Sequence, residues 1–264
     1  MDVGDFPLSA QAISRGLNTR LFRHIRYYEQ LGSTNNIAGR LAENGEPEGT
    51  VIITDEQTTG RGRLGRMWLA PARSSILMSA ILRPPVSLAS LTRVTMAASL
   101  AARAAIHLET GLETLIKWPN DILVNGKKCG GVLAEANTTG NELEYVILGM
   151  GINVNFAATS VPGIPATATT LADELGHPAE RIALVRALLS SLDQYYGRLK
   201  EGESLHDEWA AALSNLHQVV LVQTPWGHEH GVAEAVDEDG ALILRRADGS
   251  PVRLIAGEVT LSPR

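Results

Sequence analysis

The chain has 264 residues, of which 44% are hydrophobic and 20% are charged, and its formal net charge at pH 7 is −6. This length supports one large core and a small extra domain, while the acidic charge argues against general binding to nucleic acid or to membrane surfaces. A single cysteine excludes an internal disulfide and a multi-cysteine zinc site, and the sequence has no signal peptide and no long apolar run, so we expect a cytoplasmic protein.

The first elements of the chain follow an α/β pattern. Ser33 or Thr34 can cap a helix that ends near residue 44, where Asn-Gly is a typical stop signal. The β-branched run at residues 50–54 predicts a strand that enters a loop rich in Gly and Arg. Residues 75–82 predict the strand that leaves this loop.

The next elements show the same kinds of signal. Between two apolar runs, the Asn-Gly pair at residues 125–126 favours a hairpin with a type I′ turn. Apolar residues at helical spacing between residues 182 and 199 predict a helix that packs on the core. We therefore expect a helix at 90–108, hairpin strands at 121–124 and 127–135, a strand at 144–148 and a long helix at 178–199.

The last part of the chain is rich in short predicted strands. After residue 218, runs of Val, Leu and Ile alternate with turn signals such as Asp-Gly at residues 248–249. This pattern is typical of a small β-barrel of about 50 residues. We expect two domains, a mixed β-sheet domain with flanking helices at residues 1–215 and the small β-barrel at residues 216–264.

The charge of the chain is unevenly distributed. Residues 57–108 contain no Asp or Glu, and all seven charged residues in this stretch are Arg. Three of them, Arg61, Arg63 and Arg66, alternate with Gly in the run Gly-Arg-Gly-Arg-Leu-Gly-Arg at residues 60–66. Glycines allow positive φ and close backbone approach, and guanidinium groups bind phosphate or carboxylate through paired hydrogen bonds. The run therefore predicts a flexible loop that clamps polyphosphate, and the alternative is a solvated basic loop.

Two common phosphate-binding motifs fit this run poorly. The glycines satisfy the dinucleotide pattern G-x-G-x-x-G, but no helix opens there and Glu109 is the first acid available for a ribose contact. No Gly-Lys-Ser or Gly-Lys-Thr closes the run, which argues against a P-loop.

A second polar cluster lies at residues 117–121, with the sequence Lys-Trp-Pro-Asn-Asp. The proline argues against a helix and predicts a shaped corner. After the hairpin turn, Lys128 can return toward Asp121, and the Gly-Gly pair at 130–131 would let a ligand lie against the backbone. A carboxylate beside cations is what magnesium-nucleotide chemistry requires. Taken alone, however, a simple turn and an exposed lysine explain these residues.

Three further residues have plain structural explanations. His228 and His230 alternate across a predicted hairpin and could hold a metal, but exposed turn histidines are the commoner case. Cys129 follows Lys128 directly, yet no His lies nearby in the sequence, so a packing role is favoured over that of a nucleophile.

Together, five motifs resemble those of a biotin–protein ligase, and they cover almost the whole chain in order. They are Ser-Thr-Asn at 33–35, the arginine run at 60–66, the corner at 117–121, Lys-x-Gly-Gly at 128–131 and Gly-x-Gly-Ile-Asn at 149–153. The resemblance implies a class II synthetase/lipoyl-ligase-like catalytic domain and a C-terminal Src-homology-3-like barrel. It also implies two steps: biotin and ATP form biotinyl-adenylate, and a lysine of the biotin carboxyl carrier domain of an acyl-CoA carboxylase then takes the biotinyl group.

The resemblance also implies a role for each matching residue. Biotin-binding positions are Ser33, Thr34, Asn35, Gln57, Arg61, Gly62, Arg63, Trp68, Lys128, Gly130 and Gly131. ATP-binding positions are Arg63, Arg66, Asn120, Asp121, Lys128 and Asn153. Lys128, Arg63 and Asp121 are the expected catalytic residues, with Lys128 bridging the biotin carboxylate and the α-phosphate and Asp121 holding magnesium with ATP.

Two rival functions remain open. A lipoate or octanoate transferase shares the general fold, but such relatives lack the corner at 117–121 and have a different Arg-Gly run. A noncatalytic sensor of biotin or nucleotide is disfavoured by the intact Lys128, Asp121 and arginine run. Only about 24 residues precede the first expected strand, too few for the three-helix DNA-binding module that some of these ligases carry. We expect no DNA or membrane partner, and a monomer or weak homodimer.

Overall fold

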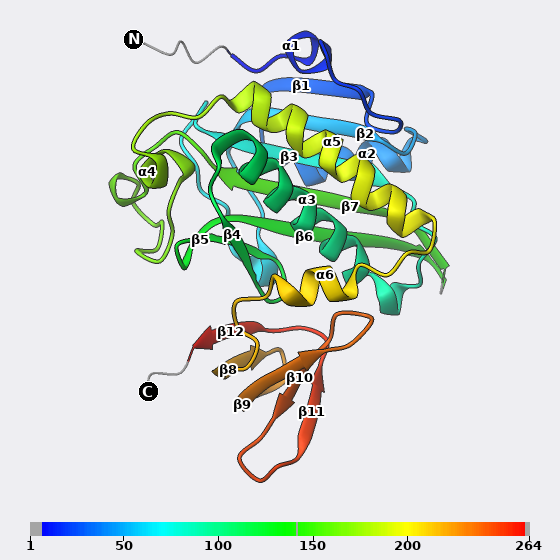
Figure 1. Cartoon of the computed structure of the whole chain (residues 1–264). Helices are drawn as coiled ribbons and strands as arrows, with labels where there is room; N and C mark the ends of the chain where they lie inside the picture. Colours follow the sequence, from blue (N-terminus) through cyan, green and yellow to red (C-terminus); the bar gives the residue numbers. More distant parts are fainter. Residues whose placement is uncertain (1–6, 141, 262–264) are drawn as a thin grey trace.

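The computed structural model describes residues 7–140 and 142–261. The larger part of the molecule is a seven-stranded sheet with helices on both faces, and a five-stranded antiparallel sheet lies below it (Figure 1). The large sheet has the strand order β1-β2-β3-β7-β6-β5-β4. Its strands are β1 (His24–Leu31), β2 (Thr50–Gln57), β3 (Ser75–Leu82), β4 (Thr114–Lys117), β5 (Asp121–Val124), β6 (Lys127–Thr139) and β7 (Glu142–Asn153).

Strand pairing in the large sheet brings segments that are far apart in sequence to the same end of neighbouring strands. β1 and β2 are parallel, with a helix as the crossover between them, whereas the other neighbours are antiparallel. In this register Ser75 at the start of β3 pairs with Asn153 at the end of β7, and Gly151 pairs with Gly131 of β6. The two glycine-containing motifs and the arginine loop between β2 and β3 therefore lie close together, at the same end of these central strands.

The helices cover the two faces of this sheet. They are α1 (Ala10–Ser14), α2 (Thr34–Glu43), α3 (Thr92–Thr110), α4 (Leu171–Leu175), α5 (Arg181–Lys200) and α6 (His206–Ala211), with 3-10 turns η1 (Arg63–Gly65), η2 (Leu88–Ser90) and η3 (Ala158–Ser160). Figure 1 shows α3 and α5 side by side across one face, and α2 packs against β2, β3 and β7. The many alanines of α3 permit this close approach to both α5 and the sheet.

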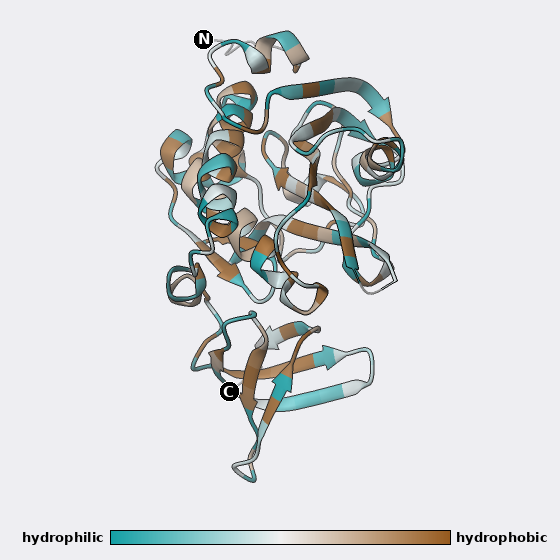
Figure 2. Ribbon diagram, turned by 90° about the vertical axis from the view of Figure 1, so that its right-hand side faces the viewer, coloured by the Kyte–Doolittle hydropathy of each residue, from teal (hydrophilic) through white to brown (hydrophobic). Residues whose placement is uncertain are grey.

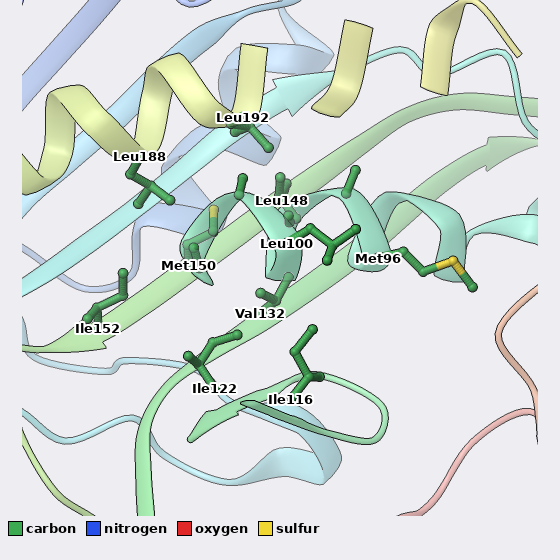
Figure 3. Packing of buried hydrophobic residues seen from close by; sticks show 14 of the residues in the cluster. Met96, Leu100, Ile116, Ile122, Val132, Leu148, Met150, Ile152, Leu188 and Leu192 are labelled. Atoms are coloured by element: carbon green, nitrogen blue, oxygen red, sulfur yellow. The ribbon is translucent and has the colours of Figure 1, made fainter. Parts of the chain in front are cut away.

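Side chains of β3 point to opposite faces of the sheet and so belong to two separate cores. Ile76, Met78 and Leu82 belong to the main core under α3 and α5, whereas Ile81 belongs to the smaller core under α2. Figure 3 shows the main core, where leucines of α3 and α5 meet the aliphatic side chains of β4 to β7. Truncating one such buried aliphatic side chain to alanine costs about 2–5 kcal/mol.

The smaller sheet is antiparallel and has the order β11-β10-β9-β8-β12. Its strands are β8 (Val219–Thr224), β9 (Gly227–Val236), β10 (Leu242–Arg245), β11 (Pro251–Leu254) and β12 (Glu258–Leu261). Figure 2 shows apolar positions concentrated between the elements of each part, with polar positions outside. Trp118, which is 1% exposed, joins the two parts because its Nε1 donates to the carbonyl oxygen of Gly240 at 2.9 Å.

Most predicted elements are confirmed. The mixed α/β fold with a separate β-rich C-terminal part is as expected, and positive φ angles at Asn125 (49°) and Gly126 (76°) agree with the predicted type I′ turn. Several boundaries were wrong: α5 begins at Arg181, α3 lies two residues later than predicted, and β2, β6 and β7 extend beyond the predicted strands. The short α1, β4, α4 and α6 were not predicted. Within the described ranges, no helix combines the length and apolarity needed to cross a membrane.

Candidate active site

A large cavity lies between the large sheet, the arginine loop (residues 60–68) and the C-terminal sheet. Its volume is about 670 Å³, within the range of about 300–1,000 Å³ that is usual for small-molecule sites. The walls come from the start of α2, strands β2, β3, β6 and β7, the turn between β4 and β5, the long loop after β7, and β12. The cavity therefore draws on both parts of the molecule.

Nearly all residues that the sequence predicts for the site line this cavity. They are Ser33, Thr34, Asn35, Gln57, Arg61, Gly62, Arg63, Arg66, Trp68, Asn120, Asp121, Lys128, Gly131 and Asn153. Gly130 is not among the lining residues, because a Cβ there would point at the side chains of Ile122 and Ile152 on the core side of the sheet. Neighbouring residues of a strand face opposite sides, so the structure brings Gly131 and not Gly130 to the cavity.

One end of the cavity carries a buried network of uncharged polar groups. Oε1 of Gln57 accepts from the backbone N–H of Thr34 at 2.8 Å and from its hydroxyl at 3.0 Å. The Ser79 hydroxyl lies 2.7 Å from Thr34 Oγ1 and 2.5 Å from Oδ1 of Asn35. Because these contacts occupy the oxygen of Gln57, its amide N–H₂ is the group that this side chain can offer to a ligand.

The first turn of α2 positions this network. Ser33 is the N-cap residue, with φ −152° and ψ 134°, but its side chain makes no capping hydrogen bond. The expected cap position is therefore correct, whereas the hydroxyl remains available for another partner. Ser33, Thr34 and Asn35 are all buried, so the helix start presents hydroxyl and amide groups to the cavity with little water around them.

The arginine loop folds back on itself as a tight hairpin. The backbone N–H of Gly62 donates to the carbonyl oxygen of Arg66 at 2.8 Å, and that of Trp68 donates to the carbonyl oxygen of Gly60 at 3.0 Å. A Cβ on Gly60 would lie 2.4 Å from the carbonyl oxygen of Trp68, so only glycine fits there. The tip turns through Leu64 at φ 57°, and it is exposed.

The three arginines of this loop diverge. Arg61 reaches α2 and β6, where it donates to Oδ1 of Asn36 at 2.7 Å and pairs with Glu135. Arg63 donates to Oδ1 of Asn120 at 3.0 Å, and Arg66 donates to Glu258 of β12 at 2.7 Å.

This divergence changes the interpretation of the loop. Arg61 lies toward the uncharged network, whereas Arg63 contacts the corner at residues 117–121 and Arg66 contacts β12, so the three guanidinium groups do not form a single clamp. Burial lowers the pKa of the Arg63 guanidinium from its ordinary value, although the nearby Asp121 and Glu258 act in the opposite direction. A partly desolvated cation of this kind binds an anion more strongly than one in water.

A cluster of cations and one carboxylate occupies the middle of the cavity. Nζ of Lys128 lies 2.6 Å from Oδ1 of Asp121, and Nζ of Lys117 lies 3.6 Å from its Oδ2. The hairpin register shifts between Ile122 and Leu123, which leaves Cys129 as an extra residue on β6. This bulge lets Lys128 face the cavity together with a glycine three residues later, which an unbroken strand would not allow.

Trp68 forms an apolar wall beside this cluster. Nζ of Lys128 is 5.7 Å from the centroid of the Trp68 ring, within the range of a cation–π contact. A Cβ on Gly151 would lie 2.6 Å from the same ring, and one on Gly131 would lie 3.5 Å from it. The bare backbone of β6 and β7 is thus what allows the indole to lie flat over the sheet.

Three groups of lining residues were not predicted from the sequence. They are Gly163, Ile164, Pro165, Thr167 and Ala168 of the loop after β7, Ser214 and Asn215 before β8, and Glu258, Val259 and Thr260 of β12. The loop is tied to Lys128, whose backbone N–H donates to the carbonyl oxygen of Thr167 at 2.9 Å. The Pro-Gly pair at 162–163 marks a loop in the sequence, but no sequence signal indicated that it or β12 reaches the site.

The residues present fit a magnesium ion that arrives with a nucleotide. In the described ranges, no group of three or more His, Cys, Asp or Glu side chains could hold a metal ion. Magnesium bound with ATP takes most of its ligands from phosphate and water and needs only one or two protein carboxylates. Asp121 lines the cavity, and the buried Oδ1 of Asn153, also on its wall, has no hydrogen-bond partner.

The residues set aside as structural behave accordingly. Cys129 is fully buried, and burial raises the pKa of its thiol to about 12, which suits packing and not nucleophilic attack. His228 and His230 lie on β9, outside the cavity lining.

Comparisons with known proteins place this geometry in context. The model described as "Biotin/lipoate A/B protein ligase family" matches residues 27–153, and the one described as "Biotin protein ligase C terminal domain" matches residues 220–262. Over 246 residues the chain is 34% identical to "Bifunctional ligase/repressor BirA" of Bacillus subtilis (strain 168), covering 92% of this chain and 76% of that protein.

Two further matches agree. The chain is 33% identical over 246 residues to "Biotin--[acetyl-CoA-carboxylase] ligase" of Mycobacterium tuberculosis (strain ATCC 25618 / H37Rv), covering 90% of this chain and 89% of that protein. Among solved structures, "Biotin protein ligase from Aquifex aeolicus in complex with biotin and ATP" aligns with a TM-score of 0.78 at 27% identity, covering 92% of this chain and 100% of that one.

Proposed function

This chain belongs to the biotin–protein ligase family, and we propose that its cavity forms biotinyl-adenylate and then transfers the biotinyl group to a lysine of a carrier domain. The protein is a ligase that uses biotin and ATP. The observation that carries the proposal is the placement of Lys128, Lys117 and Arg63 around one cavity beside a polar, uncharged pocket.

In the first step, a carboxylate oxygen of biotin attacks the α-phosphorus of ATP. A bond forms between that oxygen and phosphorus, and the bond to pyrophosphate breaks, so pyrophosphate leaves with its electron pair. No general base is needed, because a carboxylate is already ionised at neutral pH. The barrier is mainly the repulsion between two anions and the charge that develops at phosphorus, which cations relieve.

Lys128 is the residue we assign to the meeting point of the two anions. Its ammonium group lies at the start of β6, 2.6 Å from Asp121 and over the wall made by Trp68. While one of its N–H groups keeps the contact with Asp121, the other two can donate to the biotin carboxylate and to an α-phosphate oxygen. A lysine has three donors, so it can hold both oxygens and keep a bond to the aspartate.

Biotin is assigned to the end of the cavity near α2. Hydroxyl and amide groups of Ser33, Thr34 and Gln57 suit the ureido ring, which has both hydrogen-bond donors and a carbonyl acceptor. The indole of Trp68 over the glycine backbone of Gly131 and Gly151 suits the apolar part of the ligand. This orientation points the carboxylate of biotin toward Lys128.

The nucleotide is assigned to the opposite end, with Arg63, Arg66 and Asn120 on the phosphate side. Asn153 and the loop at residues 163–168 close this end. Asp121, together with the phosphates, would hold magnesium, and Oδ1 of Asn153 is a second oxygen in reach of that region. When bound, the ion supplies positive charge that offsets the negative charge of the phosphates.

In the second step, the amine of the acceptor lysine attacks the carbonyl carbon of biotinyl-adenylate. A carbon–nitrogen bond forms, the bond to the AMP oxygen breaks and the amine loses a proton. The family acts on biotin carboxyl carrier substrates of carboxylases, and we propose that such a carrier domain approaches the exposed arginine loop beside β12. Both elements line the cavity.

A transfer assay tests this proposal. The purified chain is incubated with magnesium-ATP, biotin and the carrier domain of an acetyl-CoA carboxylase, and the carrier is weighed by mass spectrometry. We expect the mass of one biotinyl group on a single lysine, and none on a carrier whose acceptor lysine is replaced by arginine. Equal labelling of both carriers would contradict the proposed specific transfer.

A further inference from the structure

Glu135 of β6 links the arginine loop to the polar network at the biotin end. One carboxylate oxygen, Oε2, accepts from Nδ2 of Asn35 at 2.7 Å. The other, Oε1, pairs with the guanidinium group of Arg61, which also donates to Oδ1 of Asn36 at 2.7 Å. A single side chain therefore contacts both the loop and the first turn of α2.

The contact with Glu135 completes the fixation of the Asn35 amide. The oxygen of this amide meets the hydroxyl of Ser79 at 2.5 Å, and its nitrogen donates to Glu135. A Cβ on Gly149 would lie 2.3 Å from Oδ1 of Asn35, so the amide also rests against bare backbone. Because Ser79 in turn contacts Thr34, the orientation of Asn35 determines how the neighbouring hydroxyls are arranged.

We propose that Glu135 is a positioning residue that couples the conformation of the arginine loop to the orientation of the polar groups that receive biotin. Glu135 does not line the cavity, so it acts through Arg61 and Asn35 and not on the ligand. This inference rests on the proposed function, because it assumes that biotin occupies the end of the cavity near α2. An acid at this position also holds one loop arginine away from the phosphates.

The two contacts of Glu135 differ in strength. Its ion pair with Arg61 is partly solvated, with side chains 30% and 46% exposed, so water and salt weaken it. Its hydrogen bond to Asn35 is better shielded, because Asn35 is only 6% exposed. The buried contact should therefore control biotin recognition, and the exposed one should control how long the closed loop retains the intermediate.

The variants Glu135→Ala and Glu135→Gln separate these two contacts. The glutamine can keep an oxygen for Asn35 but loses the charge that holds Arg61. For Glu135→Ala we expect the KM for biotin and the dissociation rate of biotinyl-adenylate both to rise about tenfold, with the KM for ATP nearly unchanged. For Glu135→Gln we expect mainly the faster dissociation. Glu144→Gln, an exposed change on β7, is the matched control and should leave all three values unchanged.

A double-mutant cycle distinguishes coupling from a purely structural role. If Glu135 acts through the loop, the double variant Arg61→Met/Glu135→Ala should release biotinyl-adenylate no faster than whichever of the two single variants releases it faster. Two effects that simply multiply would overturn the inference. So would a Glu135→Ala protein with a lower Tm but unchanged KM for biotin and unchanged dissociation rate.

The same experiment separates this inference from the proposed function. If the unaltered protein forms no biotinyl-adenylate, the proposed function itself fails. If the unaltered protein forms it and Glu135→Ala retains it equally well, the function stands and the role of Glu135 is wrong.

Discussion

The ammonium group of Lys128 lies 2.6 Å from the carboxylate of Asp121, across a hairpin with a β-bulge at Cys129, beside Lys128. This contact keeps a cation in place at the centre of a site that must accept two anions. The positive charge of Lys128 also balances the negative charge of Asp121 until a ligand arrives. The reaction chemistry proposed for the chain depends on this pair more than on any other.

Replacing Lys128 by alanine should abolish adenylate formation, with a loss of at least about 100-fold, since it removes a charge placed where negative charge develops. Lys127→Ala is the matched control, because Lys127 is the preceding residue of β6 and is exposed. Biotin-dependent release of pyrophosphate measures both. Near-normal release by the Lys128 variant would remove it from the mechanism.

Arg63→Ala and Arg66→Ala should each leave measurable adenylate formation but weaker retention of the intermediate. Each guanidinium offers charge-assisted hydrogen bonds, and Arg66 must first exchange its partner Glu258 for phosphate. The loss should therefore be smaller for Arg66 than for the more buried Arg63. Arg73→Ala, in the same acid-free stretch but outside the cavity lining, is the control for the dissociation measurement.

Gly151→Ala should impair biotin binding without preventing folding. The added methyl group would lie 2.6 Å from the ring of Trp68, so the indole must move away from the cavity wall. Such overpacking costs about 1–3 kcal/mol, and we expect the KM for biotin to rise with kcat less affected. Gly197→Ala in α5, where no atom lies within 4 Å of the added methyl group, should leave binding unchanged and not lower the Tm.

Asp55→Ala should strongly destabilise the fold. Asp55 and Arg181 are each 1% exposed and form an ion pair at 2.7 Å that ties the start of α5 to the end of β2, and Tyr27 also donates to this carboxylate. Removing one partner of a buried ion pair costs about 3–5 kcal/mol, and the change also removes the acceptor of the Tyr27 hydroxyl. Chemical denaturation measures the change, and a loss below about 1 kcal/mol would contradict a large contribution of this ion pair to stability.

Much of the fold follows from local sequence signals. Residues 75–82 were predicted as a strand and form β3 without a change of boundary, because every position of that strand is buried and apolar or small. The hairpin at residues 125–126 followed from Asn-Gly. The short β4 and α6 could not be predicted in this way, because they are held by hydrogen bonds to distant residues: Ile116 of β4 donates to the carbonyl oxygen of Ala212, and Trp209 of α6 donates to Ser99.

Individual residues of the candidate site could be predicted from sequence motifs, but the contacts between them could not. The motifs gave Lys128, Asp121 and the arginines, yet the bulge that turns Lys128 into the cavity depends on the register of two strands. Likewise, Glu258 lies 192 residues from its partner Arg66, and Glu135 lies 74 residues from Arg61. A single sequence contains no local signal for pairs at such separations.

The most direct test of the account is acyl-adenylate formation without any carrier protein. The purified chain is mixed with magnesium-ATP and equal concentrations of biotin, lipoate and octanoate, and the products are identified by mass spectrometry. The geometry of the cavity predicts biotinyl-adenylate alone. The oxygen of Gln57 is held by Thr34, so its amide N–H₂ faces the ligand and would find no acceptor in acids that lack a ureido ring. A lipoyl- or octanoyl-adenylate, or no adenylate at all, would contradict this account.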